Sequence, residues 1–230
     1  MARRDVNKSF DGGAAATMLA TPASRESHAI AIAQLVTLNA FDGIDIDYER
    51  VPTASRANFT AFIATLAQKL HAANKKLSVT VYAKTSDSAN WNGPGAEDYP
   101  ALGGLADSIK IMAYDYSYST SAPGPIAPLD WLDRVASYAE STIPRHKILI
   151  GLPLYGYDWT GTTGRGVQDA TSYARKVEML KQKHPAIGGF AHWALGQEDP
   201  AVWSVIKTGG VPTPATPPPA PITKRRASGH

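Results

Sequence analysis

The chain has 230 residues, a length that suits one large domain or a modest barrel. Its net charge of +3 is small, and the basic residues 224–226 (KRR) supply much of it, which does not favour a nucleic-acid-binding protein. The absence of cysteine excludes disulfides and thiolate metal sites.

The two ends of the chain carry few structural signals. No run of residues is long and apolar enough to span a membrane. The basic N-terminus has no apolar stretch behind it, so we expect no signal peptide in this chain. Residues 1–20 are difficult to assign, apart from a turn predicted at residues 11–13 (DGG). We predict one domain over residues 1–208, followed at 209–230 by a Pro-rich linker and a basic disordered tail.

The first two expected elements are a helix and a strand. Residues 24–39 predict a helix with Ser24 as candidate N-cap and a buried face made of Ile30, Ala33, Leu35 and Val36. Residues 41–50 (FDGIDIDYER) instead alternate with a period of two, which predicts a buried strand. One face of this strand would carry Ile44, Ile46 and Tyr48, and the other Gly43, Asp45, Asp47 and Glu49.

Three carboxylates on one strand face point to acid–base chemistry, because a packed apolar core does not tolerate them. Acids two residues apart lie about 6.6 Å apart along a strand. Their mutual repulsion holds one carboxyl protonated near neutral pH, as a general acid requires. One alternative is a solvated strand edge, which would not carry Phe41, Ile44 and Ile46 so regularly. The other is a calcium loop, but the glycine that such a loop needs after its third acid is missing, because Arg50 and Val51 follow Glu49.

Helices and strands alternate along the rest of the chain, which predicts an α/β fold. Residues 53–74 predict a helix with an apolar face formed by Phe59, Phe62, Ile63, Leu66 and Leu70. A strand is expected at 77–83, and a loop at 84–107. Residues 129–141 predict a third helix, with Leu132, Val135, Ala136 and Ala139 facing inward.

Four further segments complete this alternation. Residues 108–117 predict a strand with Met112 and Tyr114 on one face and Asp115 at its end. Taken alone, Met112 and Tyr114 would be core residues. Beyond it, a strand is expected at 147–159, a helix at 170–183 and a strand at 188–195.

Several of these segments resemble the motifs of glycoside hydrolase family 18, the chitinase family. Asp42, Asp45, Asp47 and Glu49 match its DxxDxDxE signature. Residues 112–115 (MAYD) resemble its MxYD segment, and residues 151–156 (GLPLYG) its G-x-P-x-Y-G segment. Residues 188–195 (GGFAHWAL) resemble its last strand. The resemblance covers residues 20–208 and is to the bacterial spore-cortex and cell-wall hydrolases in particular.

This resemblance implies a (β/α)8 TIM-barrel fold of which the chain holds strands four to eight, without the first two or so β/α units. Residues 6–10 would be a remnant of the third strand, and the SxGG motif of that strand has only a loose echo at residues 10–13 (FDGG). The short connection between Trp159 and Gly188 leaves no room for the α+β insertion of many members. We therefore expect a shallow, open groove.

The resemblance also implies roles for individual residues. Glu49 would be the proton donor, and Asp47, with Asp45 behind it, would orient the 2-acetamido group of the substrate. Tyr114 would hydrogen-bond this group. The implied substrate-binding residues are Met112, Asp115, Tyr155, Trp91 and Trp193, the last forming the floor under the scissile sugar. Trp91 could equally cap the barrel.

The expected function is hydrolysis of β-1,4 bonds next to N-acetylglucosamine in chitin or peptidoglycan, by substrate-assisted retaining catalysis. We expect a monomer without cofactor, whose full-length parent is secreted or associated with the cell wall. A non-catalytic carbohydrate-binding protein is the alternative, although Glu49 is present. A metal-dependent hydrolase is disfavoured because His192 has no second histidine at ligand spacing. His192 is expected to be a structural histidine.

Overall fold

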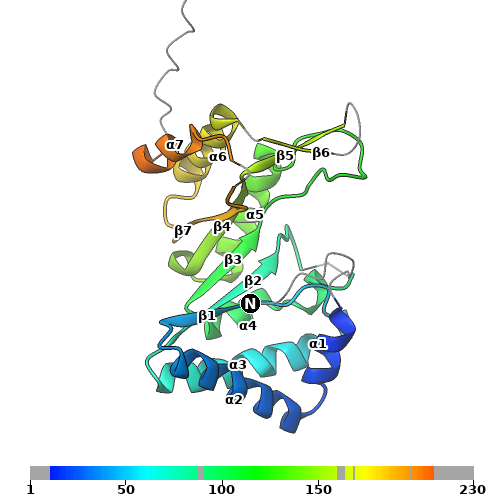
Figure 1. Ribbon diagram of the computed structural model, residues 1–230. Helices are drawn as coiled ribbons and strands as arrows, with labels where there is room; N and C mark the ends of the chain where they lie inside the picture. Colours follow the sequence, from blue (N-terminus) through cyan, green and yellow to red (C-terminus); the bar gives the residue numbers. More distant parts are fainter. Residues whose placement is uncertain (1–10, 88–90, 160–163, 168, 197, 210–230) are drawn as a thin grey trace, which may run out of the picture.

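The fold is a curved parallel sheet covered by helices, as seen in a computed structural model that describes residues 11–87, 91–159, 164–167, 169–196 and 198–209. Five strands form the sheet in the order β1-β2-β3-β4-β7, and all four neighbouring pairs are parallel. Their bounds are Gly43–Asp47 (β1), Lys76–Tyr82 (β2), Ser108–Met112 (β3), Ile148–Pro153 (β4) and Gly189–Trp193 (β7). The order follows the sequence, as in a barrel-type α/β fold (Figure 1).

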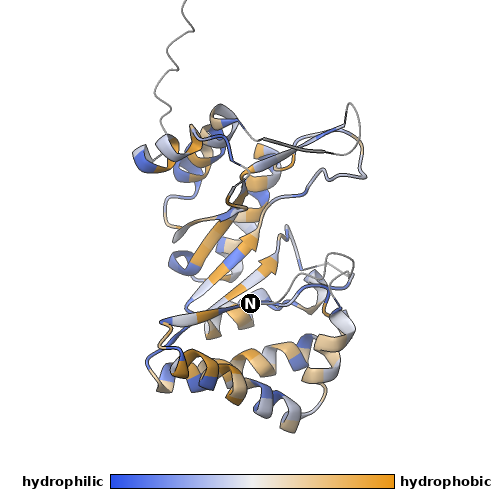
Figure 2. Ribbon diagram, in the orientation of Figure 1, coloured by the Kyte–Doolittle hydropathy of each residue, from blue (hydrophilic) through white to orange (hydrophobic). Residues whose placement is uncertain are grey.

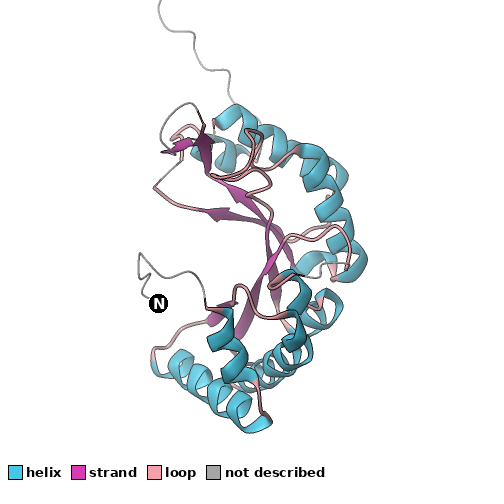
Figure 3. Ribbon diagram, turned by 90° about the vertical axis from the view of Figure 1, so that its right-hand side faces the viewer, coloured by secondary structure: helices cyan, strands magenta, loops and turns pink. Residues whose placement is uncertain are grey.

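Helices connect successive strands and cover the convex side of the sheet (Figure 3). The helices are α1 (Gly12–Leu19), α2 (Pro22–Leu38), α3 (Arg56–Ala72), α4 (Tyr99–Leu105), α5 (Leu129–Thr142), α6 (Ala170–Lys183) and α7 (Val202–Thr208). Three single 3-10 turns accompany them: η1 (Thr53–Ser55), η2 (Pro94–Ala96) and η3 (Arg145–Lys147). A separate antiparallel hairpin is made by β5 (Tyr155–Asp158) and β6 (Gly164–Val167).

The hydrophobic core lies between the sheet and the helices. Alternate strand residues such as Ile46, Val79, Ile109 and Ile150 point outward and are at most 2 % exposed. Figure 2 shows the hydrophobic colour following the sheet and the helix faces next to it. The apolar faces predicted for α3 and α5 are both confirmed, since all their named residues are buried. The other face of the strands is left for polar residues.

The sheet is open at both edges within the described residues, because β1 and β7 each pair with one neighbour. The barrel-type α/β fold and the five strands expected as numbers four to eight are confirmed. The proposed remnant of a third strand at 6–10 and the tail at 210–230 lie outside the described residues. Among the helices that are described, none has the length and apolar character needed to cross a membrane.

Three predictions near the N-terminus were wrong in whole or in part. Residues 11–13 do not form a turn: Asp11 caps α1 by accepting a hydrogen bond from the Ala14 amide at 3.1 Å. In α2, Thr21 rather than Ser24 is the N-cap, and the two form a capping box. The predicted buried face of α2 is confirmed at Val36 and in part at Ala33, whereas Ile30 and Leu35 are exposed. Ala29 and Ile32 are buried in their place. Apolar side chains of α2 lie on several sides of the helix, so their spacing alone did not identify the buried face.

Two further segments differ from the prediction in their elements. Residues 84–107 are not all loop, because η2 and α4 lie within them; Asp98 caps α4 through the Ala101 amide. The strand expected at 147–159 is interrupted after Pro153, where Leu154 donates its amide hydrogen to the Trp193 carbonyl at 2.7 Å. The chain then leaves the sheet and enters the β5–β6 hairpin.

Candidate active site

The acidic residues of β1 lie on the concave face of the sheet. Strand pairing places Asp45 opposite Ser78 and Asp47 opposite Thr80. Thr80 in turn lies opposite Lys110 of β3. Because partners in register share a face, these polar side chains form one layer inside the curve of the sheet. The predicted alternation of β1 is thus confirmed from Gly43 to Asp47.

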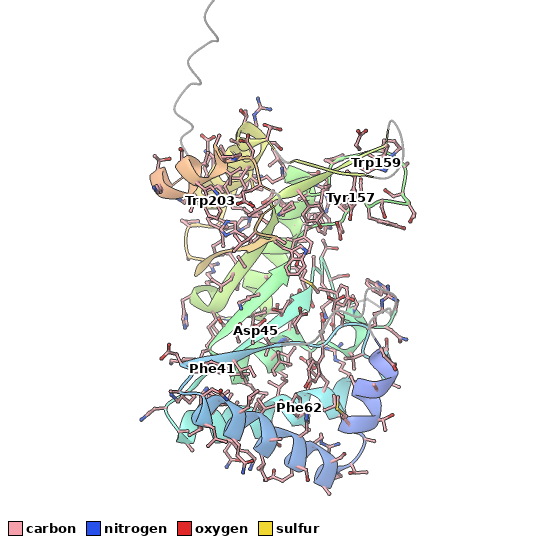
Figure 4. The ribbon with its side chains drawn as sticks, in the orientation of Figure 1. Phe41, Asp45, Phe62, Tyr157, Trp159 and Trp203 are labelled. Carbon is pink, nitrogen blue, oxygen red and sulfur yellow. The ribbon has the colours of Figure 1, made fainter. Side chains whose placement is uncertain are left out.

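Asp45 is held by the two strands next to β1. The Thr80 hydroxyl donates a hydrogen bond to Oδ2 of Asp45 at 2.7 Å. The Lys110 ammonium lies 3.2 Å from Oδ1 of the same carboxylate. Figure 4 shows Asp45 beside the sheet. With one oxygen on a hydroxyl and the other on a cation, the Asp45 carboxylate has a fixed orientation.

Asp47 has a raised pKa, although solvent reaches its side chain through the open cavity. Burial among protein atoms is the main cause, and the charge of Asp45 adds to it, while Lys110 acts in the opposite direction. With a raised pKa, Asp47 keeps a proton to higher pH than an ordinary aspartate does. A protonated Asp47 could donate a hydrogen bond to a polar group of a substrate in the cavity.

A cavity of about 350 Å³ opens next to this pair. Its lining comes from all five strands of the sheet or the residues just beyond them: Asp45, Asp47, Thr80, Lys110, Ile111, Met112, Tyr114, Gly151, Ala191, His192 and Trp193. The structure therefore brings five of the predicted site residues together in one cavity, namely Asp45, Asp47, Met112, Tyr114 and Trp193.

Glu49 follows two residues after the end of β1 and is half-buried. The Tyr82 hydroxyl donates a hydrogen bond to Oε2 of Glu49 at 3.2 Å. The turn after Glu49 is braced by α1, because a Cβ on Gly12 would stand 1.8 Å from the carbonyl oxygen of Arg50. Only glycine permits so close an approach. This contact explains why position 12, predicted to lie in a turn, is a glycine although it belongs to α1.

The strand expected at 108–117 ends at Met112, so Tyr114 and Asp115 lie just beyond β3, and Tyr114 lines the cavity. The pKa of Tyr114 is raised by burial and then by the charges of Asp47 and Glu49, so its hydroxyl stays protonated. Asp115 has a positive φ of 57° and accepts hydrogen bonds from Tyr155 at 2.5 Å and Tyr157 at 3.3 Å. These two hydrogen bonds connect the segment after β3 to the β5–β6 hairpin.

The remaining predicted residues fall into two groups. Trp193 is 45 % exposed on the cavity surface, while its neighbour His192 is hydrogen-bonded to the Tyr173 hydroxyl at 2.6 Å, as expected of a structural histidine. Tyr155 is buried on Asp115 and does not line the cavity. Trp91 also lies outside the lining and packs edge-on against Tyr82. Both keep their proposed binding roles as predictions.

Sequence reasoning missed three residues that contact the acids: Thr80, Tyr82 and Lys110. A signal existed for Lys110, because the period of two places it on the same face as Met112 and Tyr114. Thr80 and Tyr82 required the register between β1 and β2. Within the described ranges, no three His, Asp or Glu side chains are grouped so as to hold a metal ion.

Known proteins share this sequence and this fold. The pattern of the glycosyl hydrolases family 18 matches residues 8–169. YdhD of Bacillus subtilis, named as a sporulation-specific glycosylase, is 38 % identical over 165 residues, which cover 70 % of this chain and 39 % of YdhD. The cortical fragment-lytic enzyme of Bacillus subtilis is 31 % identical over 213 residues, covering 72 % of this chain and 49 % of that enzyme.

The solved structures include a chitinase from Chromobacterium violaceum with a TM-score of 0.80 and 29 % identity. The alignment covers 89 % of this chain and 77 % of the chitinase. The chain spans less than half of the length of the two Bacillus relatives. The family pattern nevertheless extends over most of the chain and includes its acidic strand. The chain therefore belongs to glycoside hydrolase family 18.

Proposed function

We propose that this chain is the catalytic part of a glycoside hydrolase that cleaves β-1,4 bonds next to N-acetylglucosamine. The observation that carries the proposal is the single cavity lined by Asp45, Asp47, Tyr114 and Trp193. This cavity combines two carboxyl groups, a hydroxyl donor and an exposed indole. Such a set suits a sugar that carries a polar acetamide group.

The reaction would be retaining and assisted by the substrate. An ordinary retaining pair has carboxyl groups about 5–5.5 Å apart that flank the sugar ring. Here Asp45 and Asp47 lie on one face of β1 and Glu49 follows two residues after its end, so the three acids would approach the sugar from one side. The acetamide oxygen of the substrate would replace the missing nucleophile, a mechanism known for this family as an exception to the two-carboxylate scheme.

Each acid has a distinct role in this scheme. Glu49 protonates the glycosidic oxygen, the leaving sugar departs, and the acetamide oxygen bonds to the anomeric carbon to give an oxazolinium ion. Asp47 stabilises the positive charge of this ion, while Asp45, held by Lys110 and Thr80, supports Asp47. Glu49 then accepts a proton from water, which opens the ring with net retention of configuration.

The neighbouring side chains would position the substrate. The Tyr114 hydroxyl, kept protonated by its surroundings, donates a hydrogen bond to the acetamide oxygen. Trp193 offers its exposed face to the sugar ring, and Met112 borders the acetamide. Because the connection after β5 contains β6 and α6 rather than a large insertion, a polymer could enter from the side. We therefore propose cleavage within glycan chains.

The substrate class is chitin or the glycan strand of peptidoglycan. The relatives are named for both kinds of activity, a cortical fragment-lytic enzyme and chitinases. The full-length protein would then be secreted or associated with a cell wall, and would act as a monomer without a cofactor.

A second candidate is a non-catalytic carbohydrate-binding protein. The observation in its favour is the open sheet, in which β1 and β7 are both edges within the described residues. A site bounded on one side by an open edge could bind a glycan without excluding water from the acids. Retention of Glu49 next to Tyr82 favours catalysis over this alternative.

The test is turnover of a fluorogenic N-acetyl-chitooligosaccharide and of purified peptidoglycan by wild type, Glu49→Gln and Glu26→Gln. Glu26 pairs with Lys69 on the helical side of the fold, so its substitution is a matched control. We expect wild type and Glu26→Gln to be active and Glu49→Gln to lose at least about a thousandfold in kcat while still binding. A fully active Glu49→Gln variant would refute the assignment. A folded, binding wild type without turnover would favour the second candidate.

A further inference from the structure

Glu97 is a buried carboxyl group beside the end of β2, and it belongs to none of the motifs. Glu97 is located between η2 and α4 and is 3 % exposed. Its carboxyl oxygens accept the backbone N–H of Tyr82 at 3.0 and 3.2 Å. A buried acid normally carries a cost, so its placement here calls for a physical reason.

The end of β2 supplies that reason. β1 ends at Asp47, which lies opposite Thr80, so β2 continues for two residues beyond its neighbour. At the last of these residues, Tyr82, side chains hold the backbone. Glu97 accepts its N–H, and the Tyr99 hydroxyl donates to its carbonyl oxygen. Both backbone groups of Tyr82 are thereby fixed from the same segment of chain.

The loop that carries Glu97 is itself tightly built. Lys84 is 4 % exposed, and its ammonium donates to the Glu97 carbonyl at 2.6 Å and to Asp87 at 2.8 Å. Gly93 has a φ of 101°, and a Cβ there would lie 2.6 Å from the Tyr82 ring. The loop therefore packs directly on the ring, and Tyr82 has little freedom to turn.

Tyr82 points from this loop to the catalytic acid. Its hydroxyl donates to Oε2 of Glu49 at 3.2 Å. The pKa of Tyr82 is raised, by burial first and then by the charge of Glu49, so the hydroxyl keeps its proton and remains a donor. A continuous path of contacts thus runs from the Glu97 carboxyl through the Tyr82 backbone and ring to the Glu49 carboxyl.

We infer that Glu97 is a positioning residue for Glu49 and acts through Tyr82, an inference that rests on the proposed role of Glu49 as proton donor. Glu97 fixes the Tyr82 backbone, and the Tyr82 hydroxyl sets the orientation of the Glu49 carboxyl. General acid catalysis depends on this orientation, because the proton must lie within hydrogen-bond reach of the glycosidic oxygen. Glu97 itself touches neither substrate nor the reacting atoms.

The charges around Glu97 support a role as hydrogen-bond acceptor rather than as a permanent charge. Its pKa is raised to about 8, by burial first; the Tyr82 amide and Lys84 lower it, and Asp47 and Glu49 raise it. The phenol groups of Tyr82 and Tyr99 also face it, and the charge of Glu97 raises the pKa of both. Below pH 8 the Glu97 side chain is mainly neutral, and an oxygen of its protonated carboxyl group can still accept the Tyr82 amide hydrogen.

The inference is tested by a double-mutant cycle on the chitooligosaccharide substrate, with a cooperative melt required of each variant. Tyr82→Phe is expected to lower kcat by about tenfold, the effect of about one hydrogen bond to a charged group, with KM within about twofold. Glu97→Ala is expected to lower kcat by about tenfold in the wild-type background but by less than about twofold with Phe at position 82. Glu97→Gln, whose amide oxygen can accept the same N–H, should restore most of the activity.

Two controls and a second readout complete the design. Tyr138→Phe, on α5, and Glu26→Gln are matched substitutions expected to leave kcat unchanged. In ¹³C-labelled protein, the titration midpoint of the Glu49 carboxyl should rise by about half a pH unit in Tyr82→Phe, because a donor to the carboxylate is lost. This measurement does not require turnover. Equal effects of Glu97→Ala in both backgrounds, or an unchanged midpoint, would overturn the inference.

The outcome also separates this inference from the proposed function. An inactive wild type, or an active Glu49→Gln variant, would refute the proposed function. In that case the Glu49 titration would still test whether the Tyr82 hydroxyl donates a hydrogen bond to Glu49. An active wild type and an inactive Glu49→Gln variant, together with additive effects at positions 82 and 97, would refute only the inference.

Discussion

Glu97 predicts a dependence of stability on pH that can be worked out from the structure. Its pKa is about 8 in the folded chain, compared with an ordinary value of 4.5, and burial is the main cause. Between these values the folded state keeps a proton that the unfolded state has lost. The unfolded state then binds fewer protons, so the free energy of unfolding falls as pH rises from 4.5 to 8 and is level in this respect above 8.

The magnitude follows from the size of the pKa shift. A difference of about 3.5 pKa units at 1.36 kcal/mol per unit corresponds to about 5 kcal/mol as an upper bound. The total stability of a typical domain is about 5–15 kcal/mol, so this loss is a large fraction of it. Relaxation around the ionised carboxyl reduces the value, and we expect about 2–5 kcal/mol.

The assay is urea denaturation of wild type and Glu97→Gln, followed by tryptophan fluorescence at half-unit steps from pH 4.5 to 9. The amide does not ionise, so the variant lacks this contribution while sharing all other titrations. The stability of Glu97→Gln relative to wild type should increase by about 2–5 kcal/mol between pH 4.5 and 8 and then stay constant. A relative stability that does not change with pH would refute the reasoning.

Two other predictions concern Lys110 and Gly12. Lys110→Met removes the cation 3.2 Å from Asp45; because Lys110 also lowers the pKa of Asp47, the acidic limb of the pH–kcat profile should move to higher pH and kcat should fall by about tenfold. An unchanged acidic limb would contradict this. Gly12→Ala places a Cβ 1.8 Å from the Arg50 carbonyl oxygen and should cost about 1–3 kcal/mol of unfolding free energy. Gly13→Ala is the control, since its Cβ meets only the Asp11 side chain, at 3.1 Å, and equal stabilities of the two variants would contradict the packing argument.

Local periodicity was sufficient for much of the fold. The period of two in residues 43–47 placed Asp45 and Asp47 on one face, and the period of 3.6 in α3 and α5 identified their buried faces. These predictions are correct because each of these elements buries one face, and the apolar residues of its sequence fall on that face alone. Periodicity failed in α2, where apolar side chains are distributed around the helix and only the packing partner decides which are buried.

The amino-acid sequence by itself determined the class of the fold, the acidic strand and the family motifs. The tertiary structure alone decided how the site is supported. Thr80 and Lys110 reach Asp45 through the register of three strands, and Glu97 reaches Tyr82 across a loop of some fifteen residues. Contacts of this kind depend on distances between segments remote in sequence, and the raised pKa of Glu97 depends on burial. Neither quantity is encoded in a local pattern, because both arise only when the segments pack together.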